Sequence, residues 1–305
     1  MTAREDLRAL CHALRGPAFA QGAGGNVSVK ESGTLFVKAS GIRLEAAAAP
    51  GGHALVPLDL AVRALEGDAA AEKALFAITP RPSMETFFHA LPARLVVHVH
   101  SVGMLLAACA PEGAVPFVGP RVPYHPPGRA LALAVRATTV APHASVLLES
   151  HGVLLFDESV GVAIERLEQL EAAALDRFPD APPFAEYLGA YLGPSAGSSR
   201  KLPDRRPFTG YLFPDAIVYA PAVEVDDIDT ATALGVLQDD TGSRRMVARS
   251  AAALDGACEI VAAHDWVEDV LEAAGVTPLR LPRAAVEALR ADPAEAYRQR
   301  RVEEA

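Results

Sequence analysis

A short apolar strand that ends in two histidines is the feature that most constrains this chain. Residues 95–100 read Leu-Val-Val-His-Val-His, and such a run is typical of a buried strand. Alternate residues of a strand point to the same face, so the side chains of His98 and His100 should project side by side. The pair alone is ambiguous, because a strand can carry two histidines for packing or solubility. A metal site needs at least one further ligand.

A third histidine ends another apolar run about fifty residues later. Residues 145–151 read Ser-Val-Leu-Leu-Glu-Ser-His, which places His151 at the end of a second strand. If the two strands are neighbours, three imidazoles converge and leave the open position of a catalytic zinc site. The segment Pro-Ser-Met-Glu-Thr-Phe-Phe-His places the carboxylate of Glu85 a short connection upstream. That carboxylate could ligate a metal or carry a proton, or it could simply favour a helix N-terminus.

Hydrophobic periodicity predicts a mixed α/β fold. Helices are expected at 3–15, 58–65, 83–90, 104–110, 130–135, 159–177, 226–236 and 250–263. Strands are expected at 27–30, 34–38, 95–100, 145–149, 153–156, 210–213 and 216–219. Ser83 is the expected N-cap of the third helix. The proline-, glycine- and charge-rich stretch 193–207 predicts a linker between a domain at 1–192 and a smaller α/β unit at 208–305.

Composition argues against several classes of function. The formal net charge is −10 and no block of lysines or arginines interrupts it, so a nucleic-acid surface is not expected. No apolar run reaches the length of a membrane span. The cysteines Cys11, Cys109 and Cys258 lie far apart without CxxC spacing, which indicates buried apolar residues in a reducing compartment. The N-terminus runs into charges instead of an apolar signal core, so a cytoplasmic protein is expected.

Two loops rich in hydrogen-bond donors could bind an anion. Residues 22–28 read Gly-Ala-Gly-Gly-Asn-Val-Ser and residues 38–41 read Lys-Ala-Ser-Gly. Their backbone N–H groups and the amide of Asn26 could wrap an anion, although each loop could equally be a plain turn. Neither is a Walker loop, and neither has the strand–glycine–helix order of a dinucleotide site. Tyr124, in a proline-rich loop, could reach the site or be structural.

In combination these motifs resemble the class II aldolase/adducin family. The set is Gly25-Asn26-Val27-Ser28, Lys38-Ala39-Ser40-Gly41, Pro82-Ser83-Met84-Glu85, His98-Val99-His100 and His151-Gly152. Its order and spacing fit over roughly residues 5–180, and the rhamnose-utilisation-type subgroup is the most similar. Residues 210–215 and 292–299 also resemble that subgroup. The resemblance implies a three-layer domain with a central, mostly antiparallel sheet, followed by a smaller C-terminal α/β unit.

The resemblance also implies roles for particular residues. The family's sugar-phosphate aldolases bind zinc through three histidines, which match His98, His100 and His151. Their acid/base glutamate matches Glu85, and a tyrosine proposed as a proton donor falls near Tyr124.

The phosphate-binding residues of those aldolases match Asn26, Ser40, Gly41 and Ser83. This chain departs from the fuculose phosphate type at two places. That type has a hydroxyl residue in the first glycine loop, where this chain has Ala23 or Gly24. It often has a second serine directly before the glutamate, where this chain has Met84. The substrate could therefore lack a phosphate, or the protein could hold the substrate differently.

The implied activity is that of a zinc-dependent aldolase, a carbon–carbon lyase that could also use Mn²⁺ or Co²⁺. Its substrate would be a hydroxylated sugar, sugar acid or sugar phosphate, cleaved through a metal-stabilised enediolate. A pentulose-phosphate 4-epimerase, a sugar-acid decarboxylase and a dehydratase are alternatives, because one enediolate serves several outcomes. An adducin-like binding module that keeps the fold and loses the metal is the alternative from another class. The family also implies a homo-oligomer, possibly a tetramer.

Overall fold

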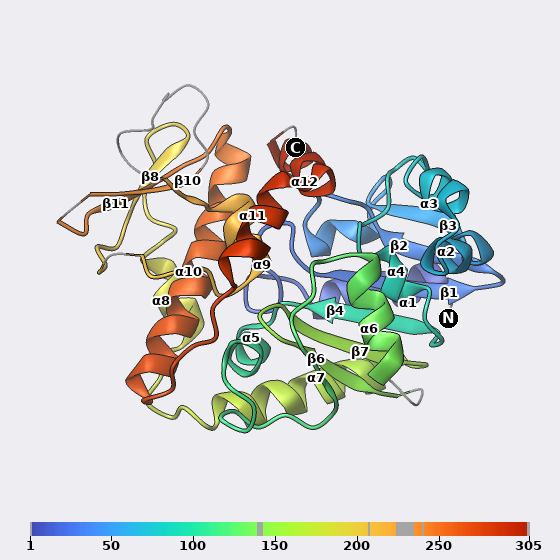
Figure 1. Cartoon of the computed structure of the whole chain (residues 1–305), viewed down its shortest axis with the longest axis horizontal. Helices are drawn as coiled ribbons and strands as arrows, with labels where there is room; N and C mark the ends of the chain where they lie inside the picture. The colour runs from blue at the N-terminus through green and yellow to red at the C-terminus, as the bar shows by residue number, and fades with distance from the viewer. Residues whose placement is uncertain (1, 139–142, 207, 224–234, 240, 304–305) are drawn as a thin grey trace.

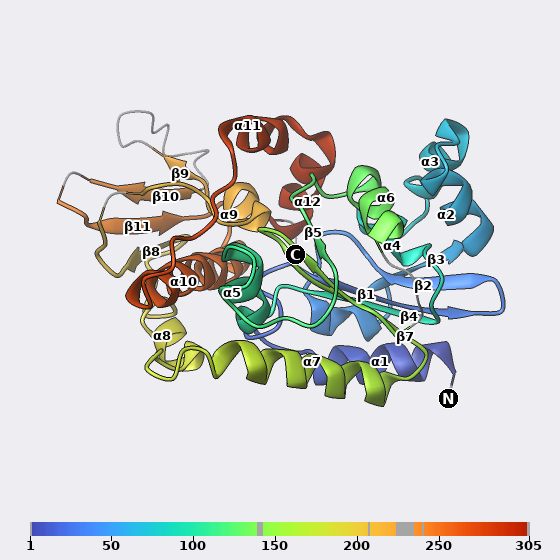
Figure 2. The same ribbon diagram turned by 60° about the horizontal axis from the view of Figure 1, so that its bottom comes forward.

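The computed structural model describes residues 2–138, 143–206, 208–223, 235–239 and 241–303. Two sheets and their covering helices make up the molecule, with the larger sheet formed by the first half of the chain (Figures 1 and 2). The predicted α/β fold is confirmed.

The larger sheet has seven strands in the order β3-β2-β1-β4-β7-β6-β5. They are β1 (Asn26–Glu31), β2 (Thr34–Lys38), β3 (His53–Pro57), β4 (Leu95–Val99), β5 (Arg121–Val122), β6 (Ser145–Leu148) and β7 (Gly152–Asp157). Within it β5 and β6 pair in parallel, and the other pairs are antiparallel. The expected mostly antiparallel sheet is therefore present.

Strand β4 lies near the middle of this sheet, between β1 and β7, and all of its residues are buried. Its sequence is a continuous apolar run because both faces of the sheet are covered. Leu95, Val97 and Val99 pack into the hydrophobic cluster on one face, and Val96 packs into the cluster on the other. This alternation places His98 on the same face as Val96.

Helices cover both faces of the sheet. One layer contains α2 (Leu58–Leu65), α3 (Ala69–Leu75), α4 (Thr86–His89) and α6 (Arg129–Thr138). The opposite face is covered by α1 (Ala3–Ala13), the 3-10 helix η1 (Leu44–Ala48), α5 (Val102–Cys109) and α7 (Val160–Leu175). The two helical layers and the sheet between them form the three-layer arrangement that the sequence led us to expect (Figure 2).

A four-stranded sheet of order β8-β11-β10-β9 belongs to the second half of the chain. Its strands are β8 (Ser199–Leu202), β9 (Ala222–Val223), β10 (Gly235–Gln238) and β11 (Arg244–Val247). The accompanying helices are α8 (Phe184–Gly189), α9 (Pro214–Tyr219), α10 (Ala251–Ala273), α11 (Arg283–Ala291) and α12 (Pro293–Glu303). The hydrophobic cluster beneath the larger sheet continues into this half, from Leu7 through to Leu289.

Several local predictions need correction. Residues 216–219 belong to helix α9, because Pro214 occupies its first turn, where the missing N–H costs nothing. Residues 210–213 form no regular strand. A four-residue apolar run is too short for periodicity to distinguish helix from strand. Of the helix expected at 226–236, residues 226–234 lie outside the described residues, and 235–236 begin β10.

Two predicted boundaries also differ in the structure. Helix α4 begins at Thr86, and its N-cap is Glu85 rather than Ser83. The stretch 193–207 contains β8, which pairs with β11 in the second sheet. In β8 the side chains of Arg200 and Leu202 are buried and Lys201 between them is exposed. The polar composition of this stretch does not reveal that alternation, so the strand was not predicted. The division into 1–192 and 208–305 remains a proposal. No helix among the described residues combines the length and apolarity that crossing a membrane requires.

Candidate metal centre

Three buried histidines meet where β4 ends and β6 turns into β7. His98 lies in β4, His100 follows it, and His151 lies in the turn before β7. Antiparallel pairing of β4 with β7 sets His98 opposite Leu154 and brings the turn to the end of β4. Ring centroids are 4.8 Å apart for His98–His100 and for His98–His151, and 5.2 Å apart for His100–His151. One nitrogen of each ring lies within 4.8 Å of the others, so a single ion could bind all three.

Hydrogen bonds orient two of these rings toward a common point. The Nδ1 atom of His98 donates to the carbonyl oxygen of Val153 at 3.0 Å. A carbonyl can only accept, so the proton is on Nδ1 and the Nε2 lone pair is free. His100 presents its Nε2 atom 3.0 Å from that of His98. Burial lowers the pKa of His98 to about 3, which keeps this imidazole neutral, as a metal ligand must be.

Glycine allows the β6–β7 turn to lie directly against the end of β4. Gly152 has a φ of +148°, and a Cβ atom there would lie 2.4 Å from the carbonyl oxygen of Val99. No other residue type fits this position without moving the strand. The glycine after His151 is therefore part of what positions that ligand.

Glu85 lies against the histidines. Its Oε1 atom is 3.2 Å from His151 Nε2, and its Oε2 atom is 3.7 Å from His98 Nε2. Asn26 Nδ2 donates to Oε2 at 2.7 Å. Burial acts to raise the pKa of Glu85, but the contact with His151 and the charge of Arg298 act against it, and the pKa lies well below its usual range. An ionised carboxylate thus faces the point on which the imidazoles converge.

Asn26 and Ser83, predicted to bind an anion, lie beside Glu85. The second end of the Asn26 amide is occupied, because its Oδ1 atom contacts His89. Ser83 Oγ accepts a hydrogen bond from the Glu85 backbone N–H at 3.3 Å. Asn26 therefore holds the Glu85 carboxylate, and Ser83 holds the Glu85 backbone.

Ser40 and Gly41 occupy the neighbouring loop, where α12 covers them. The Ser40 N–H donates to the carbonyl oxygen of Arg81 at 2.9 Å. A Cβ atom at Gly41 would lie 2.4 Å from Arg301 Cβ and 3.2 Å from the carbonyl oxygen of Arg298. The C-terminal helix thus lies directly on the loop predicted to bind phosphate.

Lys38 adds a buried cation behind this loop. Its side chain is only slightly accessible, and Nζ donates to the carbonyl oxygen of Ala23 at 2.9 Å. Burial lowers the pKa of Lys38 to about 7, and the charge of Arg298 acts in the same direction. An anionic group near this site would favour the charged ammonium.

Tyr124 is partly buried, and its hydroxyl makes no hydrogen bond to any described residue. Burial raises its pKa to about 12, and the charge of Glu295 contributes in the same direction. Tyr124 therefore lies near α12, but no contact among the described residues joins it to the three histidines. Its catalytic role remains a proposal.

Residues of the C-terminal half reach this centre, and residue-by-residue analysis of the sequence did not single them out. Asp215 in α9 contacts His100, and Arg298 in α12 pairs with Asp215 and with Glu295. The Arg298 guanidinium also lies 5.4 Å from the ring centroid of Tyr219. Burial raises the pKa of Glu295 to about 7, although Arg298 opposes the shift. The only sequence signal was that residues 210–215 and 292–299 resemble one subgroup of a family.

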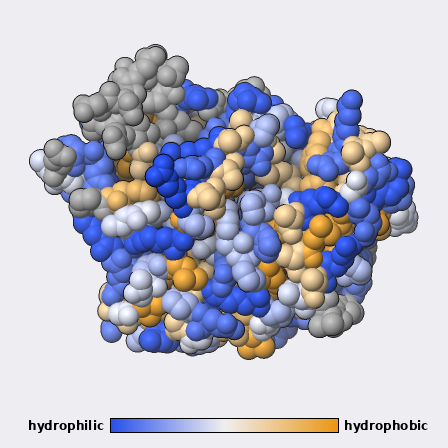
Figure 3. Space-filling view, in the orientation of Figure 1, coloured by the Kyte–Doolittle hydropathy of each residue, from blue (hydrophilic) through white to orange (hydrophobic). Residues whose placement is uncertain are grey.

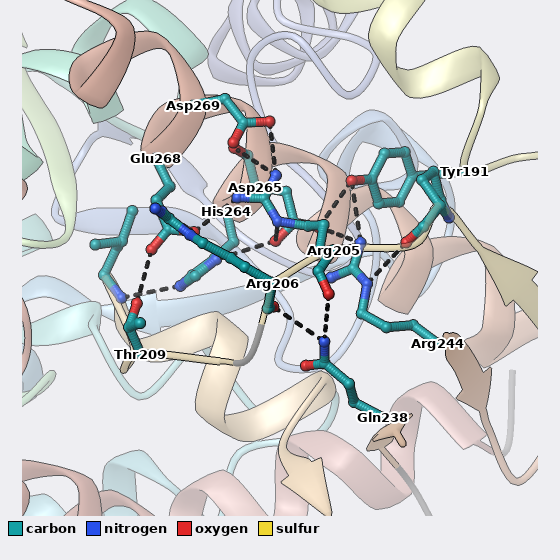
Figure 4. Close-up of polar contacts among 12 residues, drawn as sticks. Tyr191, Arg205, Arg206, Thr209, Gln238, Arg244, His264, Asp265, Glu268 and Asp269 are labelled. Carbon is teal, nitrogen blue, oxygen red and sulfur yellow. Dashed lines mark hydrogen bonds and ion pairs between the residues drawn. The ribbon is translucent and has the colours of Figure 1, made fainter. Parts of the chain in front are cut away.

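A second group of possible metal ligands lies in the C-terminal half, formed by His264, Asp265 and Glu268. Arginines already occupy its carboxylates (Figure 4). Arg244 pairs with Asp265 at 2.7 Å, and Arg205 pairs with Glu268 at 2.7 Å. This group is therefore an ion-pair network that joins α10 to the strands and loops around it.

Comparison with known families agrees with the geometry of the histidine site. The family model described as "Class II Aldolase and Adducin N-terminal domain" matches residues 5–175, more than half of the chain. The chain belongs to the class II aldolase and adducin family. The matched region contains the three histidines and Glu85, whereas Asp215 and Arg298 lie beyond it.

Solved structures resemble the part of the chain that carries this class II aldolase domain. The N-terminal class II aldolase domain of a conserved protein from Thermoplasma acidophilum is 26% identical, with a TM-score of 0.46, and 57% of this chain aligns with 91% of that one. YgbL from Escherichia coli is 24% identical, with a TM-score of 0.46 and coverage of 59% and 90%. L-fuculose-1-phosphate aldolase from Thermus thermophilus is 23% identical, with a TM-score of 0.39 and coverage of 57% and 93%. A search of curated proteins returned no match.

Proposed function

We propose that this protein is a zinc-dependent aldolase that cleaves a carbon–carbon bond in a hydroxylated sugar, sugar acid or sugar phosphate. The observation that carries the proposal is the convergence of His98, His100 and His151 beside the ionised Glu85. Three imidazoles with a position left open are a ligand set of catalytic zinc. When bound, the ion would act as a Lewis acid on the substrate carbonyl, an effect worth several kcal/mol. Mn²⁺ or Co²⁺ could occupy the same ligands.

Glu85 is the proposed proton carrier. Its carboxylate is ionised, and Asn26 holds one of its oxygens in place. In the synthetic direction Glu85 would remove the proton beside the carbonyl, and in cleavage it would return that proton to carbon. We propose that Tyr124 transfers the proton of the substrate hydroxyl group on the other side of the carbon–carbon bond that is cleaved.

The substrate is proposed to carry an anionic group. The buried guanidinium of Arg298 and the buried amine of Lys38 lie close to the loops that hold Asn26, Ser40, Gly41 and Ser83. The Ser40 N–H, the Ser83 N–H and the Asn26 amide already donate to protein acceptors. We therefore favour a carboxylate, or a phosphate held by few donors, over a phosphate surrounded by the loops. Soaking with sulfate tests this, since an anion bound far from the loops would contradict the proposal.

Other reactions of the family use the same residues. An epimerase, a decarboxylase and a dehydratase each need a proton carrier and a polarised carbonyl. The geometry of the site therefore fits all three, and only identification of the reaction product distinguishes them. An adducin-like module would need neither zinc nor an ionised Glu85. The buried histidine cluster therefore favours an enzyme.

We also propose a homo-oligomer, possibly a tetramer, as the family resemblance implies, with the closed symmetry that most soluble homo-oligomers have. Helix α7 exposes Val162 and Leu175, which makes it a candidate contact surface. On the face viewed in Figure 3, hydrophobic residues are interspersed with hydrophilic ones. Light scattering tests this proposal, and a fully active monomer would contradict it.

The test of function begins with metal content. Protein purified without an affinity tag is expected to hold about one zinc ion per chain, and a strong chelator should remove both zinc and activity. A panel of ketoses, aldonates and their phosphates should then yield an aldehyde from at least one compound. Zinc-free protein that refuses added metal would contradict the proposal, and release of carbon dioxide or an epimer would redirect it to another reaction.

A further inference from the structure

Asp215 divides its two carboxylate oxygens between the histidine centre and the C-terminal helix. Its Oδ2 atom lies 3.0 Å from His100 Nδ1, and its Oδ1 atom accepts from Arg298 Nη2 at 3.2 Å. All three side chains are at least nine-tenths buried. Because a carboxylate is an acceptor, this contact favours the tautomer of His100 that has its proton on Nδ1 and its Nε2 lone pair free to face His98. The Asp215 carboxylate is therefore placed to favour one tautomer and one orientation of the His100 ring.

The glycine-rich loop leaves room for this contact. A Cβ atom at Gly24 would lie 2.6 Å from Asp215 Oδ2 and 2.9 Å from His100 Nδ1. Any side chain at position 24 would thus press against both partners of this contact. The absence of a hydroxyl residue at Gly24 then has a structural reason of its own, separate from anion binding.

Arg298 in turn holds Asp215. Its guanidinium donates to Asp215 through one nitrogen and to Glu295 through another at 2.8 Å. Glu295 and Arg298 lie three residues apart on α12, so the helix presents them together. A line of polar contacts therefore runs from α12 through α9 to a predicted metal ligand.

We propose that Asp215 is a positioning residue of the metal centre and that Arg298 holds it for that role, so the C-terminal half completes the centre within one chain. This inference rests on the proposed function. Carboxylates that accept from a ligating imidazole orient the ring and make it a stronger ligand, and losing one typically weakens metal affinity about 10- to 100-fold. Helices α9 and α12 would then contribute to zinc affinity as well as to the fold.

Zinc affinity of the full chain tests the proposal. The dissociation constant is measured by competition with a chromophoric chelator at fixed pH, with zinc chloride as the only added ligand. Asp215→Asn keeps the size of the side chain and removes its charge, and it is expected to weaken zinc binding about 10- to 100-fold. Arg298→Lys keeps the charge and loses the forked donor, so a smaller loss in the same direction is expected.

Glu259→Gln is the matched control. Glu259 is also a buried carboxylate of the C-terminal half that bonds to the first half, through Arg43 at 2.8 Å and the Gly22 N–H at 2.9 Å. It contacts none of the three histidines. Its substitution should lower the thermal unfolding temperature while leaving the zinc dissociation constant unchanged.

A second variant disrupts the contact between Asp215 and His100 without changing Asp215. Gly24→Ala should separate Asp215 from His100 and weaken zinc binding as Asp215→Asn does, and the double variant should lose little more than either single one. Asp215→Asn and Gly24→Ala proteins that fold and bind zinc as tightly as the wild type would overturn this inference alone. A wild-type protein that binds no zinc would overturn both the inference and the proposed function.

Discussion

The two clusters of histidine and carboxylate side chains differ in their counter-ions. Among the described residues, the ion pairs of Glu85 are with His98 and His151. In the second cluster, Asp265 and Glu268 pair with arginines at 2.7 Å. A metal ion could bind the second cluster only by displacing guanidinium groups from buried carboxylates, which is costly. Ligand type and proximity therefore do not define a metal site unless the ligands are also free of competing cations.

Removing one histidine from each cluster should give the largest contrast. His98→Ala leaves two imidazoles at the first cluster, so zinc content should fall from about one ion per chain to none. His264→Ala removes a contact to the Leu212 N–H at 3.3 Å and should lower stability without changing zinc content. Atomic emission on dialysed protein measures both. Zinc loss in the His264→Ala protein would show that the second cluster binds metal after all.

Breaking the ion pairs of the second cluster should cost stability alone. Arg205→Ala leaves Glu268 and Asp265 short of a counter-charge, and the free energy of unfolding should fall by about 3–5 kcal/mol. Arg283→Ala is the control, because the ion pair of Arg283 among the described residues is an exposed one with Glu287 on α11. This variant should cost less than about 0.5 kcal/mol. Urea titration measures the difference. A small loss of unfolding free energy in the Arg205→Ala protein would mean that solvent or another cation replaces the Arg205 guanidinium.

Glu85→Gln should separate binding from catalysis at the first cluster. The amide keeps the shape of the side chain but cannot carry the proton, so turnover should fall about 100-fold or more while zinc stays bound. Glu287→Gln, on the exposed side of α11, should leave turnover unchanged. Steady-state rates on an accepted substrate check the prediction. Near-normal turnover would remove Glu85 from the mechanism.

The smallest effect expected is a pH dependence at the second cluster. Burial acts to raise the pKa of Glu268, but Arg280 and His264 lower it from 4.5 to about 2. A carboxyl group whose pKa is lower in the folded protein than in the unfolded chain stabilises the fold when the pH is above the unfolded-state pKa. That contribution is lost as the pH falls toward the folded-state pKa. Glu268→Gln should therefore be less stable than the wild type by about 1–2 kcal/mol above a pH of about 4.5. The gap should narrow at lower pH in urea titrations, and a constant gap would contradict the assigned pKa.

Local patterns predicted most of the fold and the convergence of the three histidines. The strand at 95–100 is recognisable because its apolar run is bounded by polar residues, and the helix at 159–177 because its apolar period is regular. Short runs failed, as residues 216–219 show, since four apolar residues fit a helix and a strand equally well. Zinc as the metal, the oligomer and a cytoplasmic location remain predictions.

The contribution of the C-terminal half could not be predicted from spacing. Asp215 and Arg298 are 83 residues apart, and each lies on a helix whose own pattern gives no sign of a partner. Their meeting depends on how α9 and α12 pack against the glycine-rich loop, which is a property of the tertiary structure. Gly24 was interpreted as part of an anion-binding loop for the same reason. A glycine in the sequence indicates that a side chain does not fit at this position, but it does not show that Asp215 and His100 occupy the space.

Strand β4, which carries His98, is paired on both sides and has no solvent-exposed residue. Its amide hydrogens should exchange with deuterium only when the whole sheet opens, which makes β4 one of the slowest segments of the chain. A zinc ion would have to leave by side-chain motion at the loops, without peeling the strand from its neighbours. Metal exchange and amide exchange of β4 are therefore expected on separate timescales, so the centre can be emptied and refilled many times within the lifetime of one folded molecule.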